Sequence, residues 1–169
     1  MPDSDTAPIY PRETDNLLFF CDNVPTTKDC AAEVSGTETW KNVATLTGNY
    51  NSVELRGGQA TALKFEKEIT PAENSFCVKV IYRKSSLKAG ERDDSDAGVE
   101  IITANKVTLK KLKTSPLHFR SYQVTLSWKK PSKIALHFSV PSGRKTHIFD
   151  VKEIIAYNGK CSKAPSKLD

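Results

Sequence analysis

The chain has 169 residues, of which 38% are hydrophobic and 27% charged, and it carries a formal net charge of +5 at pH 7. This is the composition of one globular domain, and a chain of this length buries roughly 70% of the surface that its unfolded form exposes, which excludes disorder throughout. The longest apolar runs, NLLFF and EIIAY, are far too short for a transmembrane helix, so no membrane span is expected.

The two ends of the chain are polar and lack strand periodicity. The first 15 residues are rich in Pro and Asp and show no basic segment followed by an apolar one, the pattern of a secretory signal. We interpret the chain as a mature form that begins with an initiator Met. A flexible N-terminal segment over 1–16, a folded domain over 17–161 and a flexible tail over 162–169 are expected.

Short runs of alternating residues predict β-strands throughout the domain. Residues 60–69 place Leu63 and Phe65 on one face and Lys64 and Glu66 on the other. Similar runs cover residues 76–84, 98–103, 106–112, 120–128, 132–140 and 147–157. Turns rich in Gly, Pro and Ser separate these runs at intervals of about ten residues. The fold class predicted is all-β, a two-sheet antiparallel jelly-roll sandwich with two disulfides.

The four cysteines indicate the cellular compartment. Cys21, Cys30, Cys77 and Cys161 are even in number and widely spaced, with no C-x-x-C pair. This pattern favours two disulfides in an oxidised, secreted protein over a zinc site. The alternative is four buried free thiols in a cytosolic protein. Three pairings of the four residues are possible.

Several landmarks follow one another in a recognisable order. The chain opens on LLFFCDNVPTTKDC, continues through ETWKNV around Trp40 and FCVKVIYRKSSLKAG, and closes on VKEIIAYNGKC. This order resembles a MAM domain, an extracellular jelly-roll module, or a divergent galactose-binding-like jelly roll of the same kind. The resemblance covers residues 17–161, although Lys152 stands where the family has an acidic residue.

The resemblance implies three properties. The first is pairing of Cys21 with Cys30 and of Cys77 with Cys161. A second is a structural calcium ion held between the N-terminal segment and the last strand, where the matching positions are Asp22, Glu38 and Glu153. The third is an adhesion-type role in binding a protein partner. Apart from this calcium ion, no cofactor is expected.

Basic residues are concentrated in the second part of the chain. Residues 1–105 carry 11 Lys and Arg against 17 Asp and Glu, whereas residues 106–169 carry 14 against 3. One interpretation is an electropositive face that binds heparan sulfate or another anionic polymer. The other is that Lys side chains solvate the strands and prevent edge pairing. The residues predicted for the basic face are Lys110, Lys111, Lys113, Trp128, Lys129, Lys130, Lys133, Arg144 and Lys145.

Motifs for catalysis and nucleic-acid binding are absent from the sequence. It contains no G-x-S-x-G elbow, no H-E-x-x-H and no Gly-rich phosphate loop. His118, His137 and His147 have no acidic residue between them, which favours surface or half-buried imidazoles over a zinc site. The basic stretch has no recognition helix or stacking platform, so nucleic acid is not an expected partner. Trp40 is expected in the core.

These observations predict a function. We expect a secreted, non-enzymatic extracellular recognition module of the adhesion type, which binds an extracellular protein. The alternative is a free-standing secreted effector or inhibitor that binds host proteins or glycosaminoglycans through the basic face.

Overall fold

The computed structural model describes residues 16–36, 38–86, 98–103, 106–110, 118–127, 130–143 and 146–161. The elements in chain order are β1 (Leu17–Cys21), the 3-10 turn η3 (Lys28–Cys30), β2 (Ala32–Ser35), β3 (Lys41–Thr45), β4 (Gly48–Arg56), β5 (Ala60–Ile69), β6 (Phe76–Ser86), β7 (Gly98–Thr103), β8 (Lys106–Lys110), β9 (Arg120–Leu126), β10 (Ser132–Ser139) and β11 (Thr146–Asn158). The expected flexible ends lie outside the described residues, apart from Asn16.

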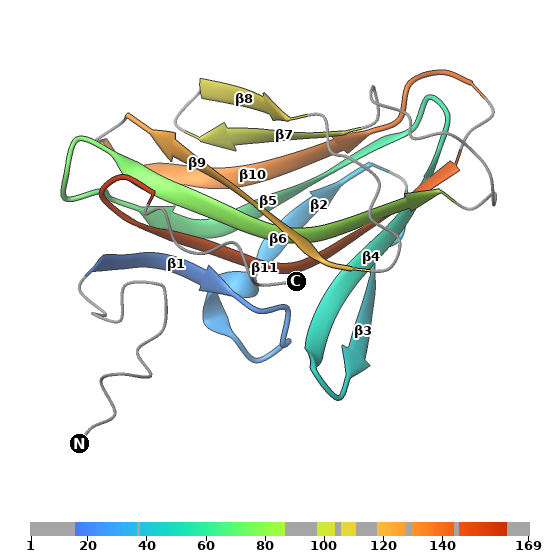
Figure 1. Ribbon diagram of the computed structural model, residues 1–169, viewed down its shortest axis with the longest axis horizontal. Helices are drawn as coiled ribbons and strands as arrows, with labels where there is room; N and C mark the ends of the chain where they lie inside the picture. The colour runs from blue at the N-terminus through green and yellow to red at the C-terminus, as the bar shows by residue number, and fades with distance from the viewer. Residues whose placement is uncertain are drawn as a thin grey trace.

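The strands form two antiparallel sheets packed as layers (Figure 1). The first sheet has the order β3-β4-β11-β6-β9, and β1 also pairs with β11. The second sheet has the order β2-β5-β10-β7-β8. The β3–β4 hairpin extends away from the layers at the lower right of Figure 1. The predicted all-β jelly-roll fold is therefore confirmed, and each predicted strand overlaps an observed one.

Alternating apolar side chains from the two sheets fill the space between them. On β5, Leu63 and Phe65 are buried while Lys64 and Glu66 are exposed, as the period of two predicted. Edge-on ring contacts join the layers, with the centroids of Phe19 and Phe65 5.1 Å apart. Trp40, which was expected in the core, is half-buried and packs against it: its ring lies 5.2 Å from that of Phe138, and its Nε1 donates a hydrogen bond to Thr61.

Strand β11 is the central strand of the first sheet and pairs with three other strands. One edge of β11 pairs with β6, whereas the other pairs with β4 up to Val151 and with β1 from Ile154 onward. Between β4 and β1 the Asn23 side-chain amide donates hydrogen bonds to the carbonyl oxygens of Val151 and Lys152, both at 2.8 Å. Asn23 is 4% exposed and has a φ of 62°. Asparagine tolerates this left-handed conformation better than most residues, so it suits this junction.

Both predicted disulfides form. Cys21 is bonded to Cys30 across the loop that contains η3, and Cys77 on β6 is bonded to Cys161 just after β11. All four cysteines are thus oxidised, and the alternative of four free thiols is wrong. In the part of the chain that the structure describes, no helix has the length and apolar character needed to cross a bilayer.

Candidate functional site

The outward-facing side of the first sheet carries a cluster of rings and cations, which we call the ring–cation cluster: Tyr50, Arg83, Phe119 and Lys152. The Arg83 guanidinium carbon lies 4.3 Å from the centroid of the Phe119 ring and 5.2 Å from that of Tyr50. The two ring centroids are 5.5 Å apart, and the Lys152 ammonium lies 5.3 Å from the Phe119 ring. Tyr50 and Phe119 are both half-buried.

An ion pair fixes the position of Arg83. Its Nε donates to Asp150 Oδ2 at 2.9 Å, because β6 and β11 place these two residues opposite each other. The Arg83 side chain is 23% exposed and that of Asp150 is 6% exposed. The Arg83 guanidinium makes no other hydrogen bond within the described residues, so its terminal N–H groups can donate to a ligand.

A β-bulge in β11 adds two charges beside this cluster. The register with β6 shifts between Val151 and Glu153. On either side of the two charged residues, Val151 and Ile154 both pack into the core. Lys152 and Glu153 therefore both lie outside the core, side by side, where a regular strand would turn one of them inward. Bulges of this kind re-aim side chains near functional sites. In FDVKEII, the two consecutive charged residues interrupt the alternation of apolar and polar residues, which is a sequence signal for this bulge.

Glu153 belongs to a second group of charges that is more deeply buried. The neighbouring Lys79 on β6 is 3% exposed, and burial lowers the pKa of its ammonium to about 8, against a smaller opposing effect of Glu153. Burial also raises the pKa of Glu153; Lys79 and Lys152 act in the opposite direction, while Asp22 raises it further. The ring–cation cluster and these neighbours together contain three cations, Arg83, Lys152 and Lys79, and three carboxylates, Asp150, Glu153 and Asp22, so the charges of these six residues balance.

The lowered pKa of Lys79 predicts a pH dependence of stability. The unfolded chain has an ordinary Lys pKa of 10.5, so between pH 8 and 10 it binds more protons than the folded protein. The free energy of unfolding contributed by Lys79 should therefore rise from pH 8 to 10. In urea unfolding, the Lys79→Met variant should lack this rise. An equal rise in the variant and the parent protein would show that Lys79 is not its source.

A pocket lies beside the first sheet, between the loop that follows β1 and the β3–β4 hairpin. Its volume is about 370 Å³. Amides and hydroxyls dominate its polar lining, and the full set of lining residues is Asn23, Val24, Pro25, Thr26, Thr27, Lys28, Cys30, Ala31, Asn42 and Asn51. The pocket could not be predicted from the sequence, because its asparagines come from separate segments and follow no motif.

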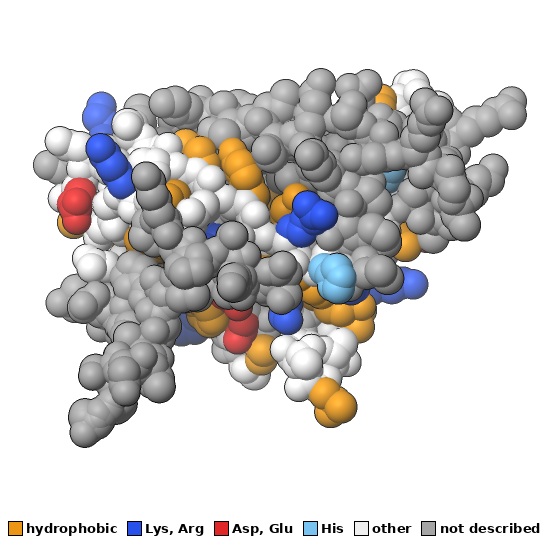
Figure 2. Space-filling model, viewed as in Figure 1, with side chains coloured by type: hydrophobic (Ala, Val, Ile, Leu, Met, Phe, Trp, Pro, Cys, Tyr) orange, Lys and Arg blue, Asp and Glu red, His pale blue; other side chains and the backbone are white. Residues whose placement is uncertain are grey.

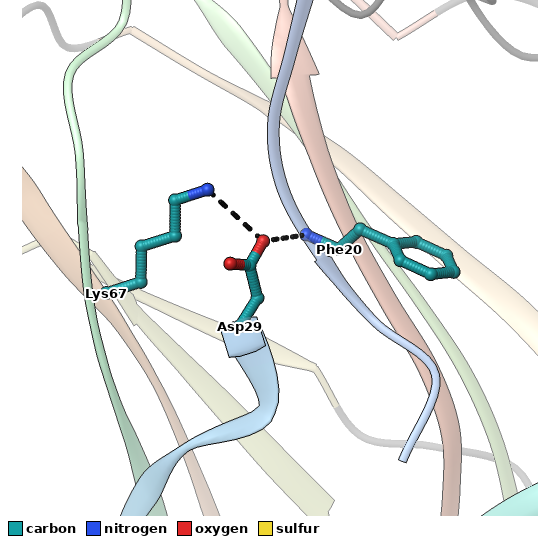
Figure 3. A network of polar contacts seen from close by, with 3 residues as sticks. All are labelled: Phe20, Asp29 and Lys67. Atoms are coloured by element: carbon teal, nitrogen blue, oxygen red, sulfur yellow. Dashed lines mark hydrogen bonds and ion pairs between the residues drawn. The ribbon is translucent and has the colours of Figure 1, made fainter. Parts of the chain in front are cut away.

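Asp29 holds the pocket loop in place. Its Oδ2 accepts a hydrogen bond from the backbone N–H of Phe20 at 2.9 Å and forms an ion pair with Lys67 at 3.2 Å (Figure 3). Phe20 belongs to β1 of the first sheet and Lys67 to β5 of the second. Together with the Cys21–Cys30 disulfide, Asp29 therefore fixes the loop against both layers.

The predicted basic face is largely untested. Lys111, Lys113, Trp128, Lys129, Arg144 and Lys145 lie outside the described residues, and for Lys110 only its place in β8 is described. Both Lys130, just before β10, and Lys133, within β10 of the second sheet, are exposed. On the side of the molecule seen in Figure 2, the coloured basic, acidic and hydrophobic side chains are interspersed.

The predicted metal ligands are not gathered into one site. Among the described residues, no group of three or more His, Cys, Asp or Glu side chains is placed to hold a metal ion, so Asp22, Glu38 and Glu153 do not form a three-carboxylate set. Asp22 instead accepts hydrogen bonds from the Val24 N–H and the Thr27 hydroxyl. The structural calcium ion stays a prediction.

The histidines lie on different elements. His137 is on β10 of the second sheet and His147 on β11 of the first, and His118 precedes β9.

Comparison with known proteins finds similarity to a venom allergen and to a CRISP/Allergen/PR-1 protein. It is 30% identical over 154 residues to Venom allergen 5 of Tityus serrulatus, covering 89% of this chain and 37% of that protein. It is 28% identical over 143 residues to the CRISP/Allergen/PR-1 protein of Trittame loki, covering 79% of this chain and 33% of that protein. The chain thus spans about a third of the length of these relatives. No protein-family model matches it.

Solved structures with a similar fold are mainly carbohydrate-binding domains. The carbohydrate recognition domain of Emp47p matches with a TM-score of 0.57 and 10% identity, covering 88% of this chain and all of that one. The module CBM6cm-2 of Cellvibrio mixtus lichenase 5A matches with a TM-score of 0.56 and 10% identity, covering 85% and 98%. The enzymatically active domain of the phage CBA120 tailspike protein 4 also matches, with a TM-score of 0.50, 11% identity and coverage of 75% and 19%. These likenesses show the fold alone.

The comparisons correct the function expected from the sequence. The relatives are venom allergen and CRISP proteins and the fold neighbours are carbohydrate-binding modules, so the prediction of an adhesion-type, protein-binding module is wrong. The alternative of an effector acting through a basic face gains no support from them either. The fold neighbours are consistent with a galactose-binding-like jelly roll, and a MAM domain is not among the proteins named. The disulfides and the venom relatives are consistent with an extracellular location.

Proposed function

We propose that this domain binds neutral carbohydrate on the outer face of the first sheet, as a non-catalytic module of a secreted protein. The observation that carries the proposal is the ring–cation cluster, in which the Tyr50 and Phe119 rings flank the Arg83 guanidinium. The C–H face of a sugar packs against aromatic rings, and its hydroxyls accept hydrogen bonds from fixed donors. The cluster offers both kinds of contact within one small area.

The charge balance of this face favours a neutral sugar. Asp150 neutralises Arg83, and Glu153 lies next to Lys79 and Lys152. An acidic sugar would therefore gain little from the summed field, whereas hydroxyls can both donate to the carboxylates and accept from the cations.

The fold neighbours add support, since TmCBM61 was solved with β-1,4-galactotriose and CBM6cm-2 with cellotriose. A secreted setting is supported by the two disulfides and by the venom relatives.

Calorimetric titration with neutral oligosaccharides tests the proposal. Cellotriose and β-1,4-galactotriose are suitable first probes, with a glycan array to widen the search. Phe119→Ala and Tyr50→Ala should each weaken binding roughly fivefold, because each removes a stacking surface worth about 1 kcal/mol. Leu46→Ala is the control, since Leu46 is fully exposed in the turn between β3 and β4, outside the ring–cation cluster.

Salt dependence separates this site from a basic polyanion site. Binding of a neutral sugar should change little between about 0.05 and 0.5 M NaCl, because screening acts on charge–charge attraction. A loss of affinity at the higher salt concentration would overturn the proposal. It would also be overturned if Lys130→Glu and Lys133→Glu weakened binding while Tyr50→Ala and Phe119→Ala bound as tightly as the parent protein.

A further inference from the structure

The pocket beside the β3–β4 hairpin is separate from the ring–cation cluster. Asn42 on β3 and Asn51 on β4 are cross-strand partners, as are Val43 and Tyr50. Successive residues of a strand point to opposite faces, so the pair of asparagines lies on the face opposite to Tyr50. A ligand held in the pocket would therefore not contact the Tyr50 ring, and the two sites can be tested independently.

A network of side-chain amides holds one wall of the pocket rigid. The Asn42 amide donates to the Asn23 carbonyl oxygen at 2.7 Å and to Asn51 Oδ1 at 2.8 Å. The Asn51 amide donates to Asn23 Oδ1 at 2.8 Å, and the Asn49 amide donates to Asn42 Oδ1 at 3.2 Å. Each amide is thereby fixed in orientation before any ligand arrives, which lowers the entropic cost of binding.

Some donor and acceptor positions of the asparagines that line the pocket are not used by this network. An amide group has two N–H donors and an oxygen that accepts twice. Within the described residues, Asn51 uses one donor and one acceptor position, and Asn42 Oδ1 accepts once. The Thr26 hydroxyl and the Lys28 ammonium add further groups to the lining. Both donors and acceptors are available, spread over two walls.

The residues that line the pocket also indicate which classes of ligand it can bind. Among the described residues, no carboxylate lines the pocket, which disfavours a divalent cation, since hard cations take carboxylate and carbonyl oxygens. No aromatic ring from the described part of the chain lines it, which disfavours a flat hydrophobic ligand. The volume of about 370 Å³ is within the range of roughly 300–1,000 Å³ found for small-molecule sites. Amides and hydroxyls match the paired hydroxyls of a sugar, each of which donates and accepts.

We propose that this pocket is a second binding site, which takes a single neutral sugar unit through the amides of Asn42 and Asn51. Val24, Pro25 and the Cys30 side of the disulfide supply the apolar wall against which the carbon skeleton packs. The proposal does not depend on the ring–cation cluster, because the two sites share no residue.

Nuclear magnetic resonance titration of the whole chain tests this site. The probes are methyl β-D-glucopyranoside, methyl β-D-galactopyranoside, methyl α-D-mannopyranoside and N-acetyl-D-glucosamine, each added up to about 50 mM to cover millimolar dissociation constants. At least one sugar should shift the side-chain amide signals of Asn42 and Asn51 and saturate. If none of the four shifts these signals, the proposal is overturned.

Two variants test whether the shifts arise in the pocket. Ala31 is exposed, lines the pocket and has an extended backbone, so Ala31→Leu fills the space without straining the chain. We expect Ala31→Leu to weaken binding at least tenfold and Thr26→Val about threefold. The matched control is Ala72→Leu, since Ala72 is exposed and lies outside the pocket lining. Shifts that persist in Ala31→Leu would overturn the proposal.

A third variant distinguishes the two sites. Tyr50→Ala should leave the Asn42 and Asn51 shifts and their saturation unchanged, even where it abolishes oligosaccharide binding on the outer face. Loss of the asparagine shifts in Tyr50→Ala would overturn the second site, because those shifts would then report binding at the ring–cation cluster. A further outcome is that the parent protein shows the Asn42 and Asn51 shifts with a single sugar but no binding of oligosaccharides to the outer face. This result would support the pocket and overturn only the proposed function.

Discussion

Removal of the Cys77–Cys161 disulfide, by the paired substitution of both residues with alanine, is expected to lower the free energy of unfolding by about 4.5 kcal/mol. The bond joins residues 84 apart in sequence, so it restricts a long loop of the unfolded chain. Cys77 is fully buried against Ile155 and Tyr157, and the bond fastens the end of β11 to β6. A loss of this size is a large fraction of the 5–15 kcal/mol typical of a domain.

The Cys21–Cys30 disulfide provides the matched control. It joins residues only 9 apart, so the same loop relation gives about 2.5 kcal/mol for its paired alanine variant. Urea unfolding of both variants without reductant measures the two losses. A larger loss for the short loop than for the long one would contradict the chain-entropy explanation and point to native-state contacts of Cys21 instead.

Much of the fold could be predicted from local sequence pattern. The alternation in residues 60–69 predicted which side chains of β5 are buried, because burial of one sheet face imposes a period of two. The disulfide pairing was predicted through resemblance, even though the MAM family itself is not supported. The bulge between Val151 and Glu153 was missed, since the segment was interpreted as a regular strand.

The candidate sites could not be predicted in the same way. Tyr50, Arg83, Phe119 and Lys152 come from four separate segments, and they meet only because β4 and β6 flank β11 in one register. A single sequence carries no signal for that pairing. The charge distribution along the chain instead pointed to residues 106–169. A linear count does not register ion pairs across strands, such as Arg83 with Asp150.

The sequence also gave no indication of the role of Asn23, although the first sheet depends on it. Its amide occupies the gap where the edge of β11 passes from β4 to β1. Without this amide, the carbonyl oxygens of Val151 and Lys152 would have no donor there, and water has little access because Asn23 is 4% exposed. A buried carbonyl without a partner costs about 1–3 kcal/mol.

Asn23→Ala is therefore expected to lower the free energy of unfolding by about 2–4 kcal/mol, measured by urea unfolding at pH 7. Part of this loss comes from the backbone, because alanine is strained at a φ of 62°. Asn23→Gly separates the two causes: it relieves the strain, worth about 1 kcal/mol, but still lacks the amide.

Asn23→Asp keeps the shape of the side chain while replacing the donating amide with an oxygen that faces two carbonyl oxygens, so it should destabilise at least as much as alanine. Asn49→Ala is the control, because the Asn49 amide makes one exposed hydrogen bond and should cost no more than about 0.5–1 kcal/mol. If Asn23→Gly were as stable as the parent protein, the amide would not be the link between β4, β11 and β1.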